Sequence, residues 1–189
     1  MDWLSEAASR SILQGVAMFR GSADARIDEK GRFKVPSKFR DVLLKGFGPK
    51  VFLTSYGPPS MRLYPLAEWI LIEDALRRNH WGDDPRVQQF LRTVDLYGDE
   101  QEIDPQGRVL IHPRLRKHTR MNGDVVVLGH PTNLLEIWNE ELLMQIQEKE
   151  PLGDETIRFV SGILREARHG NGAPPRPGDG PGGGGVPPG

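Results

Sequence analysis

The chain has 189 residues, of which 37% are hydrophobic, 22 are glycine and none is cysteine. Without cysteine, the chain cannot form disulfide bonds, thiolate metal sites or a cysteine nucleophile. The net charge of −1 argues mildly against a nucleic-acid ligand, so a phosphate-binding surface would have to come from a local concentration of basic side chains.

The first 17 residues lack the pattern of a secretory signal. Asp2 and Glu6 stand where such a signal has lysine or arginine, and no uninterrupted apolar run follows them. No later stretch approaches the roughly 18 consecutive apolar residues that a membrane-spanning helix needs. We therefore expect a cytoplasmic protein that does not enter the membrane. Because the strand pattern begins only at Met18, residues 1–17 are expected to be an N-terminal extension that folding does not require.

Residues 22–69 predict a first unit of two β-hairpins around a short helix. The stretch SADARID leads into a turn in which Asp28 starts the bend and Gly31 takes the position that needs a positive φ, and RFKVP returns as the partner strand. Pro36 suits the first turn of a helix, SKFRDVLLKG, and Gly46 suits its end. A second hairpin then joins VFLTSYG and SMRLYPL through a turn rich in glycine and proline.

Residues 70–97 are expected to form a helical connection, built from AEWILIEDALRRN and PRVQQFLRTVDLYG.

Residues 98–141 repeat the pattern of the first unit. The segment from Asp28 matches the segment from Asp104 at an offset of 76 residues, with aspartate, glycine and arginine at identical positions. The strand RVLIH, the helix PRLRKHTRMNG with Gly123 as its expected end, and the hairpin DVVVLGH with NLLEIW complete the second unit.

Two further helices are expected after the repeats, in residues 142–169, from NEELLMQIQEKE and DETIRFVSGILREARHG. The remaining residues, 170–189, are almost entirely glycine and proline, so they cannot bury enough apolar surface to offset the entropy of ordering, and we expect a disordered tail.

Apolar residues recur at helical spacing in the helices outside the hairpins, which one small barrel could not all cover. This pattern predicts a closed homo-oligomer, with packing of these helices on their own barrel as the alternative. The residues concerned are Trp69, Ile70, Ile72, Leu76, Ile157, Val160, Ile163 and Leu164.

Basic residues gather around both first hairpins, although the whole chain is near neutral. Residues 20–40 carry seven basic side chains against three acidic ones, and residues 104–120 carry five against one, so each segment has a local net charge of +4. The basic and acidic surfaces are therefore expected to be separate.

The Asp-x-x-Gly-Arg motif at Asp28 and again at Asp104 has two interpretations. In the structural one, aspartate holds the turn, glycine supplies the left-handed conformation, and arginine is a solvent-exposed strand residue paired to aspartate. In the functional one, a two-stranded ribbon enters the major groove of DNA and Arg32 and Arg108 reach phosphates or guanine. The aspartates would then preset the arginine side chains and lower the entropy lost on binding.

Two copies of the motif within basic segments favour the functional interpretation. Lys30, Lys34, Lys38 and Arg40 are then either phosphate contacts or plain solvated charges. The complete predicted DNA-binding set is Asp28, Lys30, Arg32, Lys34, Lys38, Arg40, Asp104, Arg108, Arg114 and Arg116.

Other chemistries have little support. The five histidines show no HExxH spacing, the glycine-rich turns do not resemble a GxxxxGK[ST] phosphate loop, and no nucleophile is paired with a base. We therefore expect no metal, no cofactor and no enzymatic activity. The aromatic residues are expected to fill the barrel and helix interfaces rather than to stack on bases, namely Phe52, Tyr64, Trp69 and Trp138.

Several of these stretches together resemble the MraZ family over residues 18–168. They are Met18-Phe19-Arg20-Gly21, the segment from Asp28 to Arg40, and the second Asp104-x-x-Gly107-Arg108 strand leading to Leu135-Glu136-Ile137-Trp138. The resemblance implies a mainly β fold with flanking helices (α+β), in which two in-chain swapped-hairpin units of the kind shared with AbrB and MazE close a double-split β-barrel. One departure is His112-Pro113, where the family usually has Pro-Pro, which puts the local backbone in question and suggests a mild pH sensitivity.

The resemblance also implies a function. Members of this family are sequence-specific regulators that bind direct repeats of double-stranded DNA in the promoter of their own division and cell-wall gene cluster, and they assemble into rings, for which an octamer is one expected size. Association with the nucleoid would follow. The alternative is an antitoxin-type module that binds DNA and a protein, although the tail after Gly170 offers only Val186 as an apolar anchor for such a partner.

Overall fold

The computed structural model describes residues 18–78 and 83–169. The predictions for residues 1–17 and for the tail 170–189 lie outside the described residues. The described residues form two compact units that meet between Gln145 and Ile146 in the sequence, and all the described strands belong to the first. The repeat boundaries, 22–69 and 98–141, stay predictions, because both repeats fall within that first unit.

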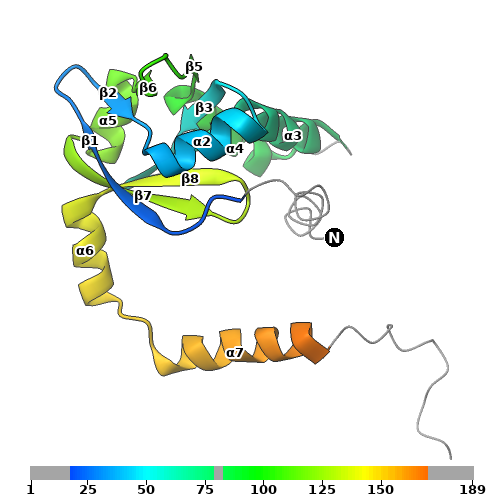
Figure 1. Cartoon of the computed structure of the whole chain (residues 1–189). Helices are drawn as coiled ribbons and strands as arrows, with labels where there is room; N and C mark the ends of the chain where they lie inside the picture. Colours follow the sequence, from blue (N-terminus) through cyan, green and yellow to red (C-terminus); the bar gives the residue numbers. More distant parts are fainter. Residues whose placement is uncertain (1–17, 79–82, 170–189) are drawn as a thin grey trace, which may run out of the picture. The chain divides into compact units, whose positions relative to one another are not determined.

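Figure 1 shows the elements of the first repeat, with one helix between two hairpins and two helices after them. In chain order they are β1 (Ser22–Ile27), β2 (Arg32–Lys34), α2 (Ser37–Gly46), β3 (Lys50–Thr54), β4 (Ser60–Pro65), α3 (Leu66–Arg77) and α4 (Pro85–Tyr97). The second repeat has the same order: β5 (Asp99–Glu102), β6 (Arg108–Leu110), α5 (Pro113–Thr119), β7 (Gly123–His130), β8 (Leu134–Asn139), α6 (Glu140–Lys149) and α7 (Asp154–His169).

The eight strands form one antiparallel sheet in which the two repeats exchange hairpins. The order is β5-β3-β4-β8-β7-β1-β2-β6, so β1 of the first repeat pairs with β7 of the second, and β5 of the second pairs with β3 of the first. The outermost strands, β5 and β6, are joined by their own turn, where the Asp104 N–H donates to the Arg108 carbonyl over 2.9 Å. The sheet is thus a nearly closed barrel, and the predicted fold of two swapped-hairpin units with flanking helices is confirmed.

The strand register relates the repeats by a pseudo-two-fold axis. In the β2–β6 ladder Phe33 faces Val109, its own equivalent at the 76-residue offset, while Arg32 faces Leu110 and Lys34 faces Arg108. At the β4–β8 ladder Arg62 faces Glu136, which likewise occupy equivalent positions in the second hairpins. The axis therefore passes through the β2–β6 and β4–β8 ladders, in each of which equivalent residues face each other.

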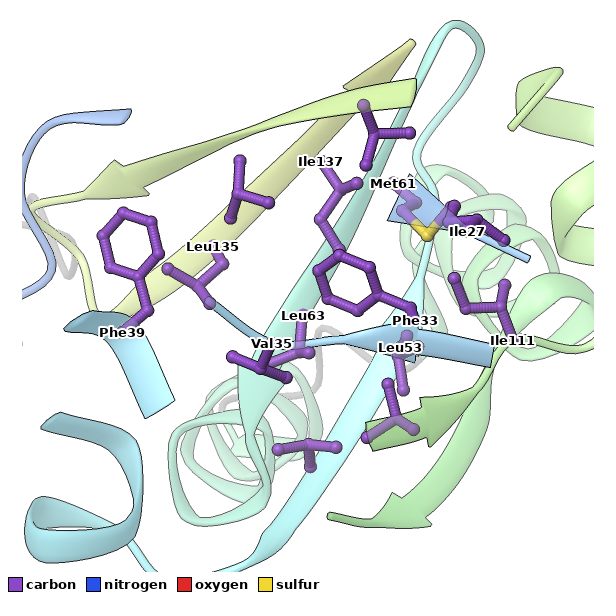
Figure 2. Packing of buried hydrophobic residues seen from close by; sticks show 14 of the residues in the cluster. Ile27, Phe33, Val35, Phe39, Leu53, Met61, Leu63, Ile111, Leu135 and Ile137 are labelled. Carbon is purple, nitrogen blue, oxygen red and sulfur yellow. The ribbon is translucent and has the colours of Figure 1, made fainter. Parts of the chain in front are cut away.

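Side chains from both repeats fill the barrel and form one hydrophobic core. The cluster includes Phe33, Val35 and Leu63 of the first repeat together with Ile111 and Ile137 of the second (Figure 2). All five side chains are at most 1% exposed. Because residues alternate between the two faces of a strand, burial of Phe33 and Val109 forces their neighbours on β2 and β6 to face outward.

A second, smaller cluster covers the outer face of β3 and β4. The Trp69 ring from α3 stacks on Phe52 with ring centroids 4.4 Å apart, and Tyr64 and Val94 pack beside it. Trp69 is 2% exposed and its neighbour Ile70 is 45% exposed. The assignment of Trp69 to an exposed stripe is therefore wrong, because this ring covers its own barrel, as predicted for the aromatic residues as a group.

The helix ends differ in detail from the sequence prediction. Pro36 is the N-cap of α2 rather than a first-turn residue, and Gly46 is its last helical residue. The helix α5 ends at Thr119, where Arg120 takes a left-handed φ of 55° as the C-cap, and Gly123 instead begins β7. The Met121 N–H donates to the Arg116 carbonyl over 3.0 Å, and the Met121 side chain is buried, so burial of the next apolar residue turns the chain before Gly123 is reached.

His112 explains how the second repeat tolerates its departure from Pro-Pro. His112 is the N-cap of α5, and its Nδ1 accepts a hydrogen bond from the Arg114 N–H over 3.2 Å. Pro113 follows at the first helical position, where its missing N–H costs nothing. The side chain at position 112 thus satisfies a helix-end donor that a proline would leave unpaired.

The helix α7 of the second compact unit exposes its apolar residues. Ile157, Val160, Ile163 and Leu164 are each between 44% and 52% exposed. They recur at spacings of three and four, so they lie along one side of the helix. In the described part of this helix, this apolar side is about half exposed.

The ring of His118 on α5 packs against α4. It stacks on the Tyr97 ring, with centroids 3.8 Å apart and planes 15° from parallel. Its Nε2 is buried and has no hydrogen-bond partner among the described residues. Burial lowers the pKa of His118, since the charged form would lose its hydration there.

We predict that acidification destabilises the protein in part through His118. Because folding lowers the pKa of His118, the unfolded chain takes up a proton on this histidine at a higher pH than the folded protein does. The folded state therefore keeps its full stability above the unfolded pKa of about 6.5. The contribution of the neutral His118 to stability is lost as the pH falls through its pKa in the folded protein. The melting temperature of the wild type should fall more between about pH 7.5 and about pH 5.5 than that of His118→Phe, which keeps a ring on Tyr97 without a titrating group. Equal pH dependence in the two proteins would contradict this assignment.

Candidate nucleic-acid interface

The two Asp-x-x-Gly-Arg turns have the same backbone geometry. In the first, the Gly31 N–H donates to the Asp28 carbonyl over 2.8 Å, and the Arg32 N–H donates to the Asp28 Oδ1 over 2.9 Å. In the second, the Gly107 N–H donates to the Asp104 carbonyl over 2.8 Å, and the Arg108 N–H donates to the Asp104 Oδ1 over 2.8 Å. Both aspartates therefore hold their turns, as in the structural interpretation of the motif, which leaves the arginine side chains to be considered separately.

The two arginine side chains differ. The Arg32 Nε donates to the Asp28 Oδ2 over 2.6 Å. The hydrogen bonds from the backbone and side chain of Arg32 lower the pKa of Asp28. Asp104 and Arg108 are also joined by a backbone hydrogen bond, but within the described residues the Asp104 carboxylate bonds to the Arg108 backbone N–H and not to its guanidinium group. The first aspartate thus orients the side chain of its arginine, and the second does not.

Each turn is covered by an arginine from the other repeat. A Cβ atom at Gly31 would lie 2.8 Å from the Arg116 Nε, and one at Gly107 would lie 2.8 Å from the Arg40 Cδ. The Arg116 Nη1 also donates to the Glu29 carbonyl over 3.3 Å. Gly31 and Gly107 are therefore needed for two reasons, their φ values of 85° and 79° and the close approach of these arginines.

The outward side of the β2–β6 ladder carries three of the six exposed predicted site residues. Arg32 and Lys34 on β2 and Arg108 and Leu110 on β6 are exposed. The Val35 N–H donates to the Gly107 carbonyl and the Ile111 N–H to the Gly31 carbonyl, each over 2.9 Å, so one turn flanks each end of this ladder. We call the surface formed by Arg32, Lys34, Arg108 and Leu110 the β2–β6 face.

The other predicted basic residues are not brought onto this face. Lys30 is exposed in the first turn itself. The Lys38 ammonium donates to the Ser22 carbonyl and lies 4.7 Å from the Phe39 ring centroid, and the Arg114 Nη1 donates to the Leu96 carbonyl over 3.4 Å. Backbone carbonyls thus accept hydrogen bonds from Lys38 and Arg114, both of which remain exposed, and their DNA-binding role stays a prediction.

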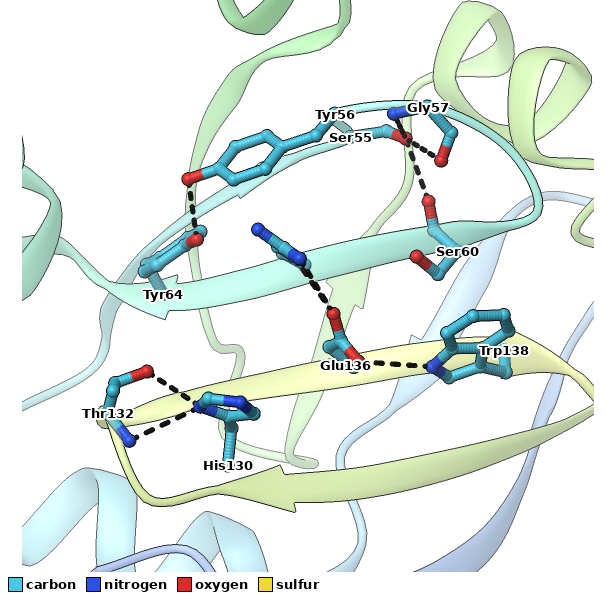
Figure 3. Close-up of polar contacts among 10 residues, drawn as sticks. Ser55, Tyr56, Gly57, Ser60, Tyr64, His130, Thr132, Glu136 and Trp138 are labelled. Carbon is cyan, nitrogen blue, oxygen red and sulfur yellow. Dashed lines mark hydrogen bonds and ion pairs between the residues drawn. The ribbon is translucent and has the colours of Figure 1, made fainter. Parts of the chain in front are cut away.

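A polar network at the other ladder on the axis was not predicted from the sequence (Figure 3). Arg62 forms an ion pair with Glu136 at 3.0 Å and lies 4.0 Å from the Tyr56 ring centroid. The Trp138 Nε1 donates to the other oxygen of Glu136 over 3.3 Å, and the hydroxyls of Tyr56 and Tyr64 are 2.8 Å apart. Because Arg62 and Glu136 come from different repeats, this network joins the repeats where β4 meets β8.

No group of three or more His, Asp or Glu side chains within residues 18–78 and 83–169 is arranged to hold a metal ion. Over the same part of the chain, every helix is too short or too polar to cross a membrane.

Fold and site together define a swapped-hairpin barrel protein that presents two Asp-x-x-Gly-Arg turns on one basic face. The sequence model described as "MraZ protein, putative antitoxin-like" matches residues 98–158. The chain is 38% identical over 138 residues to the transcriptional regulator MraZ of Acidobacterium capsulatum, and the aligned residues make up 73% of this chain and 93% of that protein. It is 36% identical over 142 residues to that of Pseudoalteromonas translucida, covering 72% and 92%. The chain belongs to the MraZ family.

We predict that Gly31→Ala destabilises the protein more than Gly48→Ala does. Both glycines have a strongly positive φ, 85° and 88°, but a Cβ at Gly48 would meet no atom within 4 Å. Gly48→Ala therefore isolates the backbone strain, about 1–2 kcal/mol, and Gly31→Ala adds the overlap with Arg116 and with the Ile111 carbonyl oxygen, which would lie 3.0 Å from the Cβ. Chemical denaturation should show that this excess becomes smaller when both glycine substitutions are compared in an Arg116→Ala background. An excess of unchanged size without Arg116 would contradict the contact between this arginine and the turn.

Proposed function

We propose that this chain is a sequence-specific double-stranded DNA-binding transcriptional regulator that acts, in the cytoplasm and on the nucleoid, on the promoter of its own division and cell-wall gene cluster. The observation that carries the proposal is the β2–β6 face, on which Arg32, Lys34 and Arg108 are exposed together between two rigid turns. The names of the curated relatives, which are transcriptional regulators, support it.

The β2–β6 face has the size of a ribbon that enters DNA. Each strand has three residues, about 10 Å at the usual rise per residue, and the major groove of B-form DNA is about 12 Å wide. With its Nε held by Asp28, Arg32 can direct its two terminal nitrogens at the N7 and O6 acceptors of guanine. Arg108 lies on the neighbouring strand and supplies a second contact in the same groove.

The remaining predicted residues take supporting roles in this proposal. Lys30 and Lys34 are exposed and are assigned to phosphates, which position the protein without recognising bases. Asp28, Asp104, Arg40 and Arg116 hold the two turns in shape.

The proposal predicts that Arg32→Ala and Arg108→Ala each weaken binding to the promoter fragment by about 1–3 kcal/mol where the arginine recognises a base. The double variant should give no shifted band in a gel assay at concentrations that saturate the wild type. Arg77→Ala is a matched control, because Arg77 is an exposed arginine of α3 that pairs with Glu73. Wild-type affinity in the double variant would overturn the proposed interface.

Salt dependence separates base contacts from phosphate contacts. Replacing a lysine that binds a phosphate lowers the slope of log K against log salt by about 1 and leaves sequence preference intact. Lys34→Ala should behave in this way. The wild-type slope should be steep despite the net charge of −1, because only the basic face meets the DNA.

We further propose that the chain assembles into a closed homo-oligomer such as an octameric ring. The support is the apolar side of α7, formed by Ile157, Val160, Ile163 and Leu164, which is about half exposed. A ring of head-to-tail contacts presents identical faces in the same sense, so neighbouring subunits would bind direct repeats spaced about one turn of DNA, roughly 10 base pairs.

Light scattering tests the ring. The wild type should have the mass of a multimer at micromolar concentration, and Ile157→Glu with Ile163→Glu should lower that mass while the barrel keeps its melting temperature. The double substitution Asp154→Ala with Glu155→Ala, at the start of the same helix, serves as the control that leaves the apolar side intact. A monomeric wild type that still binds the promoter would rule the ring out.

The alternative function, an antitoxin-type module that binds DNA and a protein, is favoured by the same exposed side of α7, since it could equally hold a different protein. The mass measurement distinguishes the two. A wild type that is monomeric alone and forms a stoichiometric complex with the product of a neighbouring gene would favour the antitoxin function.

A further inference from the structure

Leu110 stands out on the β2–β6 face, because it is the apolar residue there. Its side chain is 50% exposed, while Val109 and Ile111 on either side of it are 2% and 1% exposed. The alternation of the strand therefore aims Leu110 outward, on the same side as Arg108. A single exposed leucine is common in proteins, so its surroundings decide whether it has a role.

The surroundings of Leu110 are cationic. It faces Arg32 directly across the ladder, and Lys34 faces Arg108 in the next outward pair. Directly paired residues have Cβ atoms about 4.5–5.5 Å apart. The equivalent of Leu110 in the first repeat is Lys34, at the 76-residue offset, so the second repeat places an apolar group where the first places a charge.

We propose that Leu110 contacts the C5-methyl group of a thymine beside the guanine that Arg32 recognises, an inference that rests on the proposed function. In the major groove the thymine methyl is the apolar group that base pairs present, and the other groups at the base edges are hydrogen-bond donors and acceptors. Leucine cannot satisfy any of these. When DNA covers this leucine, the contact is favourable where a methyl group lies against it, because a donor or acceptor in that place would be buried without a hydrogen bond.

The spacing of Arg32 and Leu110 on the ladder suits contacts to two neighbouring base pairs. Arg32 and Leu110 form a directly paired position of the ladder, and their side chains leave the sheet side by side. Stacked base pairs follow each other at about 3.4 Å, so two side chains about 5 Å apart can meet neighbouring base pairs. Arg32 supplies the contact to guanine, and Leu110 makes the adjacent position specific for thymine.

A protein partner fits this face less well. Three cations, Arg32, Lys34 and Arg108, surround the one leucine, and an apolar protein surface would have to desolvate all three. Phosphates on both sides of a groove neutralise them instead.

The experiment compares thymine with uracil, which differ only in the methyl group. Duplexes are enriched from a random library with the full chain, and the enriched sequence is resynthesised with deoxyuridine at each thymidine in turn. For the wild type, uracil at one position should weaken binding about fourfold, equivalent to about 0.8 kcal/mol for one buried carbon. Leu110→Ala should bind the two duplexes equally, with a loss of similar size on the thymine duplex.

Two further variants complete the test. Leu110→Lys, which copies Lys34, should also lose the preference for thymine and should raise the slope of log K against log salt by about 1. Leu71→Ala removes a leucine of α3 that is 54% exposed and should keep the wild-type preference. Since Leu110 is outside the core, thermal melts should show that its variants fold as the wild type does.

The outcomes separate this inference from the function on which it rests. If the library yields no enriched sequence, the proposed function fails. If a sequence is enriched but uracil is tolerated at every position, or if Leu110→Ala keeps the preference, the assignment of Leu110 is overturned while DNA binding stands. If Leu110→Ala changes the mass of the protein and not its preference for thymine, this face is a contact between protein chains.

Discussion

Six residues, three in β2 and three in β6, hold the two repeats together at the place where the candidate interface lies. On the inner side of this ladder Phe33 and Val109 meet on the pseudo-two-fold axis inside the core, and on the outer side the same backbone carries the β2–β6 face. Without the partner repeat, β2 would be an unpaired edge and its phenylalanine would face water. The core and the interface therefore form in one step, because neither repeat can build its half alone.

The two Asp-x-x-Gly-Arg turns also depend on both repeats, because an arginine on a helix of one repeat contacts the turn of the other. Arg116 from the second repeat lies on Gly31 of the first, and Arg40 from the first lies on Gly107 of the second. The Arg116 Nε is buried without a hydrogen-bond partner among the described residues, which is a cost that the fold bears at this position. In return, each turn is in contact with a helix of the other repeat. Under the proposed function, two turns linked in this way lose less conformational entropy when both enter one groove of DNA.

Much of the fold follows from local patterns in the sequence. The aspartate, glycine and arginine of each turn predict the hairpins, because a positive φ and an aspartate that accepts backbone N–H groups are local requirements. The 76-residue repeat predicts that β5 to β8 copy β1 to β4. The exchange of hairpins followed only from the resemblance to the MraZ family, since nothing within SADARID specifies that Arg26 of β1 pairs with Asp124 of β7, 98 residues later.

The parts that the sequence did not predict depend on tertiary burial. Trp69 and Ile70 belong to one predicted apolar stripe, and only the position of Phe52 on β3 separates the buried Trp69 ring from the exposed Ile70 side chain. Ile72 of the same stripe is half-buried against the cluster that contains Trp69. The end of α5 is set by the burial of Met121, which is invisible to a rule based on glycine. Arg62 and Glu136 are an ordinary base and an ordinary acid in the sequence, and they become a pair only through the β4–β8 register.

The pseudo-symmetry of the barrel also bears on the kind of DNA sequence that one subunit can recognise. A true two-fold axis through the β2–β6 face would make its two halves identical, and the bound site would then be a palindrome. Here the halves differ: Arg32 is held by its aspartate and Arg108 is not, and Lys34 is matched by Leu110. Under the proposed function, a subunit therefore binds its site in one orientation. Oriented subunits related by the rotation of a ring require copies of the site in the same direction, which is the arrangement of a direct repeat rather than of a palindrome.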